Sequence, residues 1–427
     1  MTEPAGIFGR DARVRRRMRG EIRFRVYGIA SIGIALAALG WLFVSLALGS
    51  AGTFRATHIL LDIHFDAALL DPEGTGDPDV TAGSDFQPLA RNALRAIFPE
   101  VRDRRERRAL NGLVTSGAPF LLRDMVLEDS SVLGRTVPVW LPASDEADLI
   151  VTDAAPDAPP GARRTKTERQ AAWLAVLADE GRVKQAINWR FLTGGDSREP
   201  ELAGILVALM GSIFSVLVCV AVSFPVGVLA AIYLQEFARP SRLTTLFEVN
   251  INNLAAVPSI IFGLFGLFFF LNVLGLPRSA PLVGGLVLAL MTLPTIIIAS
   301  RASLHAVPEA IREGALAIGA SKIQAVFHHV VPLALPGMMT GTILGMARAL
   351  GETAPLLMIG MVAFIIDVPK SILDPATALP VQIFLWADSP ERAFADKTAA
   401  AILVLLVFLV AMNAGAIFIR SRFETHL

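Results

Sequence analysis

The chain has 427 residues, of which 54% are hydrophobic and 18% are charged, and its mean hydropathy is +0.57. Soluble proteins are nearer 25% charged, so this composition excludes an ordinary soluble protein and indicates an integral membrane protein. The 38 basic and 38 acidic residues balance, so no overall field favours nucleic acid as a partner. The single cysteine, Cys219, excludes an intrachain disulfide.

Six apolar stretches are long enough to cross a membrane as helices, which takes about 20 residues. They cover residues 26–48, 203–234, 252–275, 282–300, 337–366 and 398–419. The third and fifth contain Gly and Pro, which membrane helices tolerate when neighbouring helices cover the opened backbone. The alternative for the first stretch is a cleaved signal peptide. Its apolar core exceeds the roughly 7–15 residues of such a peptide, so we expect a retained anchor.

Arginines crowd the N-terminus just before the first stretch. They are Arg10, Arg13, Arg15, Arg16, Arg17, Arg19, Arg23 and Arg25. Because positive residues stay on the cytoplasmic side, the N-terminus is expected there, and six spans return the C-terminus to the same side. The predicted organisation is a basic cytoplasmic N-terminus (1–25), an anchor helix (26–48), an extracytoplasmic domain (50–200) and a transmembrane domain (201–427).

The domain at 50–200 is polar and has no stretch that could span a membrane. Apolar residues alternate over 59–65 and 137–141, which predicts strands, and residues 87–98 and 168–187 are expected to be helices. The sequence therefore predicts a small α+β domain without recognisable chemistry.

Four polar residues on the first predicted strand have a spacing that would allow metal binding. His58, Asp62, His64 and Asp66 lie at alternate positions and can share one face. A solvated strand face is the simpler interpretation, and no metal site is predicted.

The loop between the fourth and fifth stretches covers residues 305–335. It contains residues that favour the start of a helix and, about ten positions later, a residue that favours its end. Pro308 suits the first turn of a helix over 308–318. Gly319 stands where a residue of positive φ ends such a helix. The sequence therefore predicts a short helix followed by a glycine corner.

A second short helix is predicted directly after this corner. Ser321 and Gln324 have the spacing of a capping box, and Pro332 is expected to end the helix. Apolar side chains along both helices require a surface to bury against, such as a groove on a partner protein.

The same loop resembles the EAA loop of ABC importer permeases. That pattern reads Glu-Ala-Ala, three residues, Gly, nine residues, Ile, any residue, Leu-Pro. The chain matches its spacing with Glu313-Gly314-Ala315, Gly319 and His329-Val330-Val331-Pro332, and departs from it at Gly314, His329 and Val331. The resemblance implies a coupling helix that docks onto an ATP-hydrolysing subunit.

No nucleotide-binding motif accompanies this loop. Gly314 and Gly319 have P-loop spacing, but Ala320-Ser321 follow where Lys and Ser or Thr are required. His328-His329 lack the i, i+4 spacing of a helical zinc pair. The ATPase is therefore expected to be a separate chain, with residues 313–315 and 319–321 as its docking residues.

Small residues form a stripe on the fifth stretch. Gly337, Gly341, Gly345 and Ala349 recur every four residues, which predicts close helix packing.

Two charges lie beside this stripe, inside an apolar stretch. Arg348 and Glu352 are expected to point into the bundle and to pair with one another. A pair that merely locks two helices is one interpretation. The other is a phosphate-binding arginine held by Glu352, since the planar guanidinium suits tetrahedral oxyanions. Pro355, in the next turn, is expected to act as a hinge.

The segment Ala347–Pro355 resembles the Arg-Ala-x-Gly-Glu-Thr-Ala-Pro element of phosphate-specific ABC permeases. Residues 257–263 and 188–193 resemble the same family, so the resemblance covers roughly residues 186–427 and favours the PstA family. The extracytoplasmic domain resembles an N-terminal extension seen in some of these permeases.

This resemblance implies a fold, partners and roles. The fold would be six helices of the ABC permease type in the bacterial inner membrane. Partners would be an ATPase dimer, a second phosphate permease, a periplasmic phosphate-binding protein, phosphate and lipid. The chain itself would be no enzyme and would bind no cofactor, because ATP and Mg²⁺ belong to the ATPase. Arg348, Glu352, Thr353 and Ser259 would line the substrate path.

Two other functions remain open at this point. A permease for sulfate or molybdate fits the coupling loop equally well, and only the elements around Arg348 and Val257 favour phosphate. A membrane subunit that senses phosphate status is compatible with the large extracytoplasmic domain.

Overall fold

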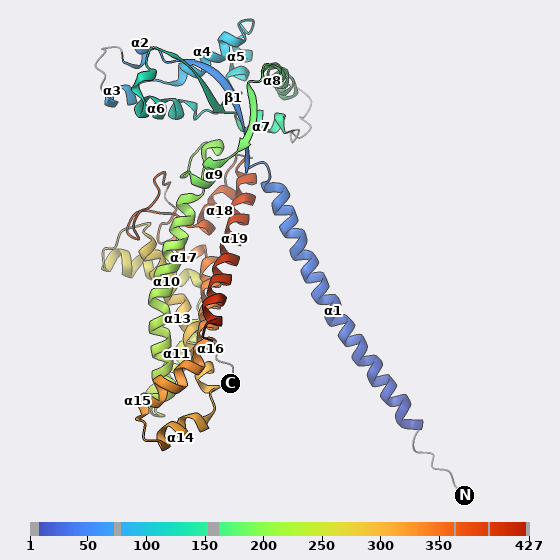
Figure 1. The fold of residues 1–427 in the computed structure, drawn as a ribbon, viewed down its shortest axis with the longest axis vertical. Helices are drawn as coiled ribbons and strands as arrows, with labels where there is room; N and C mark the ends of the chain where they lie inside the picture. Colours follow the sequence, from blue (N-terminus) through green and yellow to red (C-terminus); the bar gives the residue numbers. More distant parts are fainter. Residues whose placement is uncertain (1–7, 72–77, 153–161, 363, 392, 424–427) are drawn as a thin grey trace.

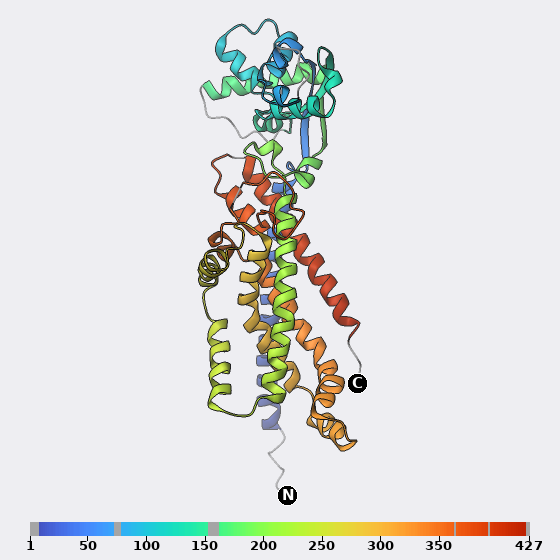
Figure 2. The same ribbon diagram turned by 90° about the vertical axis from the view of Figure 1, so that its left-hand side faces the viewer.

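The computed structural model describes residues 8–71, 78–152, 162–362, 364–391 and 393–423. A small domain built on a sheet stands at one end of a helical domain (Figures 1 and 2). The start of α1 (Phe8–Ser50) and the end of α19 (Ala393–Ser421) lie toward the other end. The N-terminal helix α1 diverges from the helical domain and meets α19 near Gly49. Residues 1–7 of the predicted basic N-terminus lie outside the described residues, and its remainder is part of α1.

The sheet domain, from residue 55 to residue 187, is organised by a central strand. β1 (Arg55–His64) lies between β2 (Thr136–Pro142) and β3 (Val183–Ile187) and pairs antiparallel with both. The predicted alternation over 59–65 is confirmed, because its odd-numbered residues are fully buried. The helices are α2 (Ala67–Leu70), α3 (Pro78–Ala82), α4 (Gln87–Ile97), α5 (Arg104–Asn111), α6 (Ala118–Glu128), α7 (Asp145–Val151) and α8 (Ala162–Asp179).

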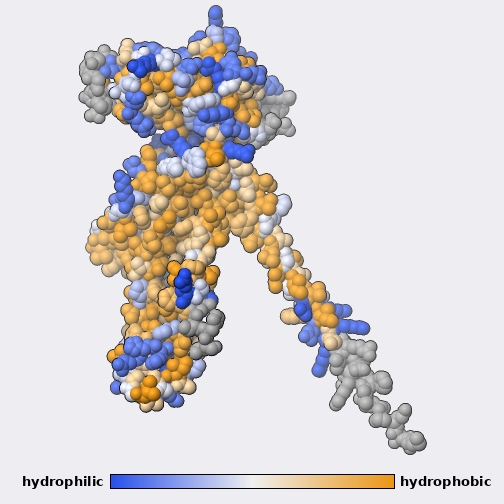
Figure 3. Space-filling model, in the orientation of Figure 1, coloured by the Kyte–Doolittle hydropathy of each residue, from blue (hydrophilic) through white to orange (hydrophobic). Residues whose placement is uncertain are grey.

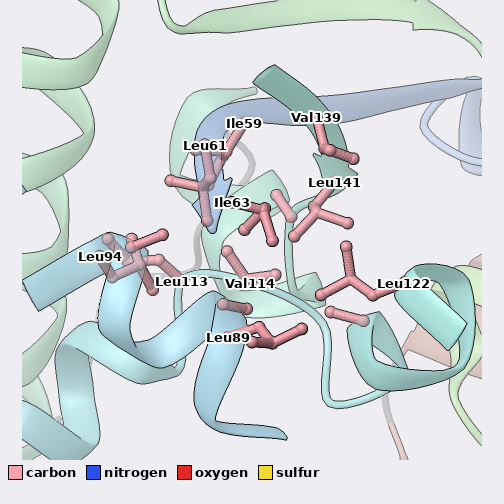
Figure 4. Packing of buried hydrophobic residues seen from close by; sticks show 14 of the residues in the cluster. Ile59, Leu61, Ile63, Leu89, Leu94, Leu113, Val114, Leu122, Val139 and Leu141 are labelled. Atoms are coloured by element: carbon pink, nitrogen blue, oxygen red, sulfur yellow. The ribbon is translucent and has the colours of Figure 1, made fainter. Parts of the chain in front are cut away.

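The core of the sheet domain lies between the sheet and the helices. Leu61 and Ile63 of β1 pack in one cluster with Leu89 and Leu94 of α4 and Leu122 of α6 (Figure 4). Burial of these side chains is the main force that holds the domain together. The helix predicted over 87–98 is confirmed as α4.

The helix predicted over 168–187 is wrong in its second half. α8 ends at Asp179, Gly181 takes a φ of +70°, and the following residues become β3. Glycine adopts this left-handed conformation at little cost, so the chain turns there and pairs with the free edge of β1. A helical pattern in isolation does not show that such an edge is available.

The helical domain has a mainly apolar surface, whereas hydrophilic and hydrophobic residues are mixed over the sheet domain (Figure 3). Five helices among the described residues are long and apolar enough to cross a membrane, and a bent pair would make a sixth. The five helices are α1, α10 (Leu206–Ile232), α13 (Pro281–His305), α16 (Val331–Leu350) together with the helical residues from Lys322 that precede it, and α19. The predicted fold class is thereby confirmed: a helical polytopic membrane protein with a small α+β domain between its first two spans.

The third predicted span is a bent pair of helices. α11 (Arg242–Ala255) and α12 (Ser259–Gly266) meet at 102°, so the expected single helix over 252–275 is wrong. Pro258 causes the break, because it lacks an N–H and disfavours helical geometry at the residue before it. Its ψ of 136° takes it out of the helix.

The fifth predicted span is also shorter than expected. α16 ends at Leu350, and α17 (Ala354–Met358) follows after a turn, so no helix continues to residue 366. A short helix that the sequence did not predict, α18 (Leu379–Ala387), packs between α10 and α19. Its nine residues are too few to span a membrane, which is why span-length reasoning passed over it.

A buried lysine lies on the helical side of the joint between the two domains. Lys397, in the first turns of α19, is 5% exposed and is the only charged residue classed as buried in the part of the chain that the structure describes. Its ammonium group donates to the carbonyl of Ala203 at 3.2 Å and lies 5.2 Å from the ring centre of Phe191. On the other side of the joint, the backbone N–H of Asp145 donates to Glu201 Oε1 at 3.2 Å. Buried polar groups therefore connect the domains.

The joint gives the stability of the chain a defined pH dependence. Burial, reinforced by the neighbouring Glu201, raises the pKa of Asp145 from 3.8 to about 8. The folded chain therefore binds a proton that the unfolded chain has released, so the free energy of unfolding falls between about pH 4 and pH 8. In Asp145→Asn this loss is absent. The thermal midpoint of the variant should exceed that of the parent, by a margin that grows from pH 5 to pH 8.

Thermal unfolding in detergent at pH 5, 6.5 and 8 measures this margin. Asp179→Asn, at an exposed carboxylate on α8, serves as the control and should follow the parent at every pH. A margin that shrinks as pH rises would show that Asp145 is ionised in the folded chain.

Candidate functional site

A rigid elbow of two short helices forms the end of the helical domain opposite the sheet domain (Figure 1). α14 (Glu309–Ala317) begins directly after Pro308, which acts as the N-cap and not as the predicted first-turn residue. At its end Gly319 has the predicted positive φ, +92°. The N–H groups of Gly319 and Ala320 donate to the carbonyls of Leu316 and Ala315 at 3.0 and 3.1 Å. These are the two bonds of a Schellman motif, so the corner has one defined geometry.

The second arm of the elbow starts with the predicted capping box. Ser321 Oγ accepts the N–H of Gln324, and the side chain of Gln324 accepts the N–H of Ser321. α15 (Lys322–Ala325) does not stop at Pro332 as expected. A π-turn over Val326–Val330 joins it to α16, and Pro332 falls in the first turn of α16, where a missing N–H is tolerated. The elbow is therefore continuous with a membrane-spanning helix.

The outer face of the elbow is apolar and uncovered. Ile318 is 82% exposed, and Leu316, Ile323 and Phe327 are exposed as well. We call these four residues the coupling surface. Glu313 and Gly314 are exposed beside it, whereas Ala315 is buried against the helical domain. Figure 3 shows apolar atoms at this tip of the molecule. An uncovered apolar surface on a rigid element is typical of a docking site for another protein.

One arginine fixes the elbow to the body of the domain. Arg312 donates to Glu236 at 2.8 Å, and both side chains are largely buried. It also donates to the carbonyls of Leu304 and Val307, each at 2.7 Å. The Glu236 carboxylate raises the pKa of Arg312. Because Glu236 belongs to a π-turn that ends α10 and Leu304 belongs to α13, Arg312 ties α14 to two long helices.

Sequence reasoning missed this anchor. Glu236 and Arg312 lie 76 residues apart, and neither occupies a recognised motif position. The sequence indicates this pair only weakly, since each partner is simply a charged residue near the end of an apolar stretch.

The candidate substrate-path residues Arg348 and Glu352 lie at the end of α16. Arg348 Nε and Glu352 Oε1 are 3.6 Å apart, as the i, i+4 pairing predicted. The Arg348 side chain is 55% exposed, so the expectation that it points into this chain's own bundle is wrong. Glu352 is 20% exposed and lies in the turn after α16, not on the helix. α16 ends at Leu350, so Arg348 stays on the helix whereas Glu352 falls in the turn that follows it.

The structure brings two distant stretches of sequence together at this point. The Cα of Pro355 is so close to Gly263 that a Cβ on Gly263 would lie 2.6 Å from it. Ser259, at the start of α12, and Thr353, which precedes α17, are both half-buried on the two packed elements. Pro355 lies in the first turn of α17, after the break in the chain, so the expected hinge inside one long helix is wrong.

The small-residue stripe of α16 faces α13. A Cβ on Gly337 would lie 2.3 Å from Ser303 Oγ, and one on Gly341 would lie 2.2 Å from the Cβ of Ala299. Gly345 faces Thr292 in the same groove, at an ordinary contact distance. The glycines therefore let the two helices approach closely.

The polar residues of the first strand do not form a metal site. Asp62 pairs with Arg182 at 2.9 Å, Asp66 caps α2, and His58 Nδ1 contacts the carbonyl of Ala56. Within the described ranges, no group of three or more His, Cys, Asp or Glu side chains could hold a metal ion.

Residues 223–425 match the family model described as "Binding-protein-dependent transport system inner membrane component". Over 251 residues the chain is 32% identical to phosphate transport system permease protein PstA 1 of Mycobacterium tuberculosis (strain CDC 1551 / Oshkosh). This match covers 58% of the chain and 81% of the relative. The chain belongs to the PstA family of permeases.

Another relative supports this membership. PstA of Haemophilus influenzae (strain ATCC 51907 / DSM 11121 / KW20 / Rd) is 33% identical over 224 residues, which cover 52% of the chain and 77% of the relative. Residues 11–158 match a separate model, "Domain of unknown function (DUF3333)", as expected for an extension that precedes a PstA-type membrane domain. A chain of the MetNI methionine ABC transporter, in inward-facing conformations, aligns at 17% identity with a TM-score of 0.40, covering 52% of this chain and 95% of that one.

Proposed function

We propose that this chain is the permease subunit of an ATP-driven importer of inorganic phosphate. It forms half of the translocation path and docks a separate ATPase through the coupling surface. One observation supports this function most strongly: a PstA-family chain presents, on a corner of fixed geometry, an apolar surface that no other described residue of the chain covers. Arg312 holds that corner against two long helices, so a displacement imposed on α14 reaches the path.

The assembly follows from this role. An ATPase dimer uses ATP and Mg²⁺ on the cytoplasmic side, where the elbow and both chain termini lie. The sheet domain then lies in the periplasm, where a phosphate-binding protein delivers the substrate. A second, different permease completes the path, and lipid of the bacterial inner membrane surrounds both. The arginines before α1 support this orientation.

Within the path, Arg348 is the proposed phosphate contact. Its guanidinium is a planar fork of donors that matches an oxyanion, and it is exposed on this chain, open to a ligand or to the second permease. Glu352 orients Arg348 and limits its affinity, because a transit site must also release its substrate. The hydroxyls of Thr353 and Ser259, on packed elements nearby, are further hydrogen-bonding groups for the substrate.

Substitution of Glu352 tests the choice of substrate. Phosphate keeps a proton near neutral pH and can donate it to a carboxylate, whereas sulfate cannot. Glu352→Gln should therefore lower uptake of labelled phosphate by about tenfold, the equivalent of one charge-assisted hydrogen bond of roughly 1.4 kcal/mol. Unchanged phosphate uptake would exclude this role for Glu352.

The control for this measurement is Glu391→Gln, at an exposed carboxylate outside the Ala347–Pro355 segment. Uptake in membranes that hold the complete complex should also resist competition by sulfate and molybdate. If sulfate or molybdate inhibited the uptake of labelled phosphate at the same concentration as unlabelled phosphate does, a permease for another oxyanion would be favoured.

A further inference from the structure

α11 lies in the inner half of the helical domain, apart from the coupling surface and from Arg348. It stands beside the half of α13 that leads to the elbow (Figure 2), and none of its residues is buried. In the proposed orientation α11 begins at Arg242 on the cytoplasmic side. Asn252 follows ten residues later, about 15 Å along the helix axis and therefore near the middle of a hydrocarbon core of roughly 30 Å.

Apolar and polar side chains lie on different sides of α11. Exposed apolar residues recur at helical spacing on one side, as expected for contact with lipid tails. They are Leu243, Phe247 and Leu254. On another side Thr245, Glu248 and Asn252 recur at i, i+3 and i+7. We call these three residues the polar stripe.

The amide of Asn252 has no hydrogen-bond partner among the described residues, although its side chain is exposed at membrane depth. Asn250, on the apolar side of α11, donates instead to the carbonyl of Leu246 at 2.7 Å. An amide without a partner is strongly unfavourable in hydrocarbon and is readily satisfied in water. The contrast between the two amides indicates that Asn252 faces water or a polar ligand.

The break between α11 and α12 indicates water on the same side of the membrane domain. The backbone leaves helical geometry at Pro258, and Ala255, Ala256 and Pro258 are all exposed. Lipid tails offer no hydrogen bonds, so irregular backbone at membrane depth occurs only where protein covers it or where it lines a water-filled cavity. This chain leaves the break uncovered.

The one charge on the polar stripe is neutralised. Glu248 Oε1 accepts a hydrogen bond from Arg301 Nη2 of α13 at 2.7 Å, and both side chains are half-buried. The pair removes the repulsion that a free carboxylate would exert on an anion. Asn252 then offers neutral N–H donors, which hold an oxyanion less strongly than a guanidinium group does.

We propose that the polar stripe lines the inner half of the phosphate path, and that the Asn252 amide donates to phosphate after Arg348 has released it. Exchange of a charged donor for a neutral one lowers the affinity toward the cytoplasm and so favours release. Ser259, which the proposed function already places on the path, follows Asn252 across the break. The inference rests on the proposed function and assigns the inner part of that path to α11.

Thiol accessibility tests this assignment without a transport measurement. Membranes that hold the complete complex, in a Cys219→Ser background and with ATP present, are prepared with Asn252→Cys or Phe247→Cys. Both positions are exposed on this chain, but a thiol reacts as the thiolate, which forms in water and hardly at all among lipid tails. A small charged thiol reagent, applied to both sides, should label Asn252→Cys at least tenfold faster than Phe247→Cys, and inorganic phosphate should slow that labelling.

Two results of this experiment would overturn the inference and leave the proposed function intact. Equal labelling rates at the two positions would place Asn252 against lipid. Slow labelling of Asn252→Cys together with its crosslinking to the second permease would place the polar stripe in a protein interface.

Uptake of labelled phosphate gives a second measurement. Asn252→Leu should lower uptake at least tenfold at a normal amount of the chain, whereas Asn252→Gln keeps the amide and should retain most of it. The matched control is Asn250→Leu, on the apolar side of the same helix, which should behave as the parent does. Leucine is the more favourable residue against lipid, so equal uptake by Asn252→Leu and the parent would contradict the inference. A parent complex that takes up no phosphate would instead refute the proposed function.

Discussion

Replacing Gly319 by valine should uncouple transport from ATP hydrolysis. At a φ of +92° glycine carries no strain, whereas an ordinary L residue in the left-handed region costs about 1–2 kcal/mol and a β-branched one costs more. The Schellman corner should therefore open and displace the coupling surface. We expect phosphate uptake to fall at least about tenfold in membranes that contain the full complex, with normal amounts of the chain.

Gly314→Ala is the matched control for this prediction. A Cβ at Gly314 would meet no atom within 4 Å, and the residue lies inside α14 with ordinary helical geometry. Alanine favours a helix over glycine by about 1 kcal/mol, so uptake should be unchanged. A Cβ at Gly319 also meets nothing within 4 Å, so the two variants separate backbone conformation from crowding. Equal uptake by Gly319→Val and the parent would show that the corner geometry does not matter.

Breaking the Arg312–Glu236 pair should reduce the coupling between ATP hydrolysis and phosphate uptake about as much as Gly319→Val does, but by a different mechanism. Removing one partner of a buried ion pair leaves the other charge uncompensated, at a cost of about 3–5 kcal/mol. Arg312→Met should therefore loosen α14 from the helical domain, so that α14 no longer transmits the motion of the ATPase. ATP hydrolysis by the reconstituted complex, measured with and without the phosphate-binding protein, should lose its dependence on that protein.

Two further variants make this prediction specific. The double variant Arg312→Met with Glu236→Leu replaces both charges by apolar groups and should recover part of the coupling. Glu309 also pairs with Arg312, but the Glu309 side chain is 74% exposed. Glu309→Gln should therefore lower the free energy of unfolding by less than about 1 kcal/mol. If Glu309→Gln matched Arg312→Met in effect, the buried pair would not be the anchor.

Much of the elbow could be predicted from the sequence because its determinants are local. The positive φ at Gly319 and the Ser321 capping box involve partners three to five residues away, so spacing alone reveals them. The strand over 59–65 was visible for the same reason, since alternation records the two faces of a sheet.

Features that depend on distant parts of the chain could not be predicted. The Arg312–Glu236 pair joins residues 76 positions apart, and β3 exists because an edge of β1 is free. The exposure of Arg348 depends on which faces of α16 the other helices cover, and the position of Glu352 depends on where α16 stops. An apolar pattern shows neither. The bend at Pro258 had a local cause, but the continuous apolar run around it concealed the break.

The coupling surface is expected to dock onto an ATPase on the cytoplasmic side, and a crosslink can detect this contact. Cys219 is the single native cysteine and is buried, so Ile318→Cys in a Cys219→Ser background places one reactive thiol on the coupling surface. A short bifunctional reagent in native membranes should join it to an ATP-hydrolysing chain, and a membrane-impermeant reagent should label it only from the cytoplasmic side. Labelling from the periplasmic side, or crosslinks that never reach such a chain, would contradict the account.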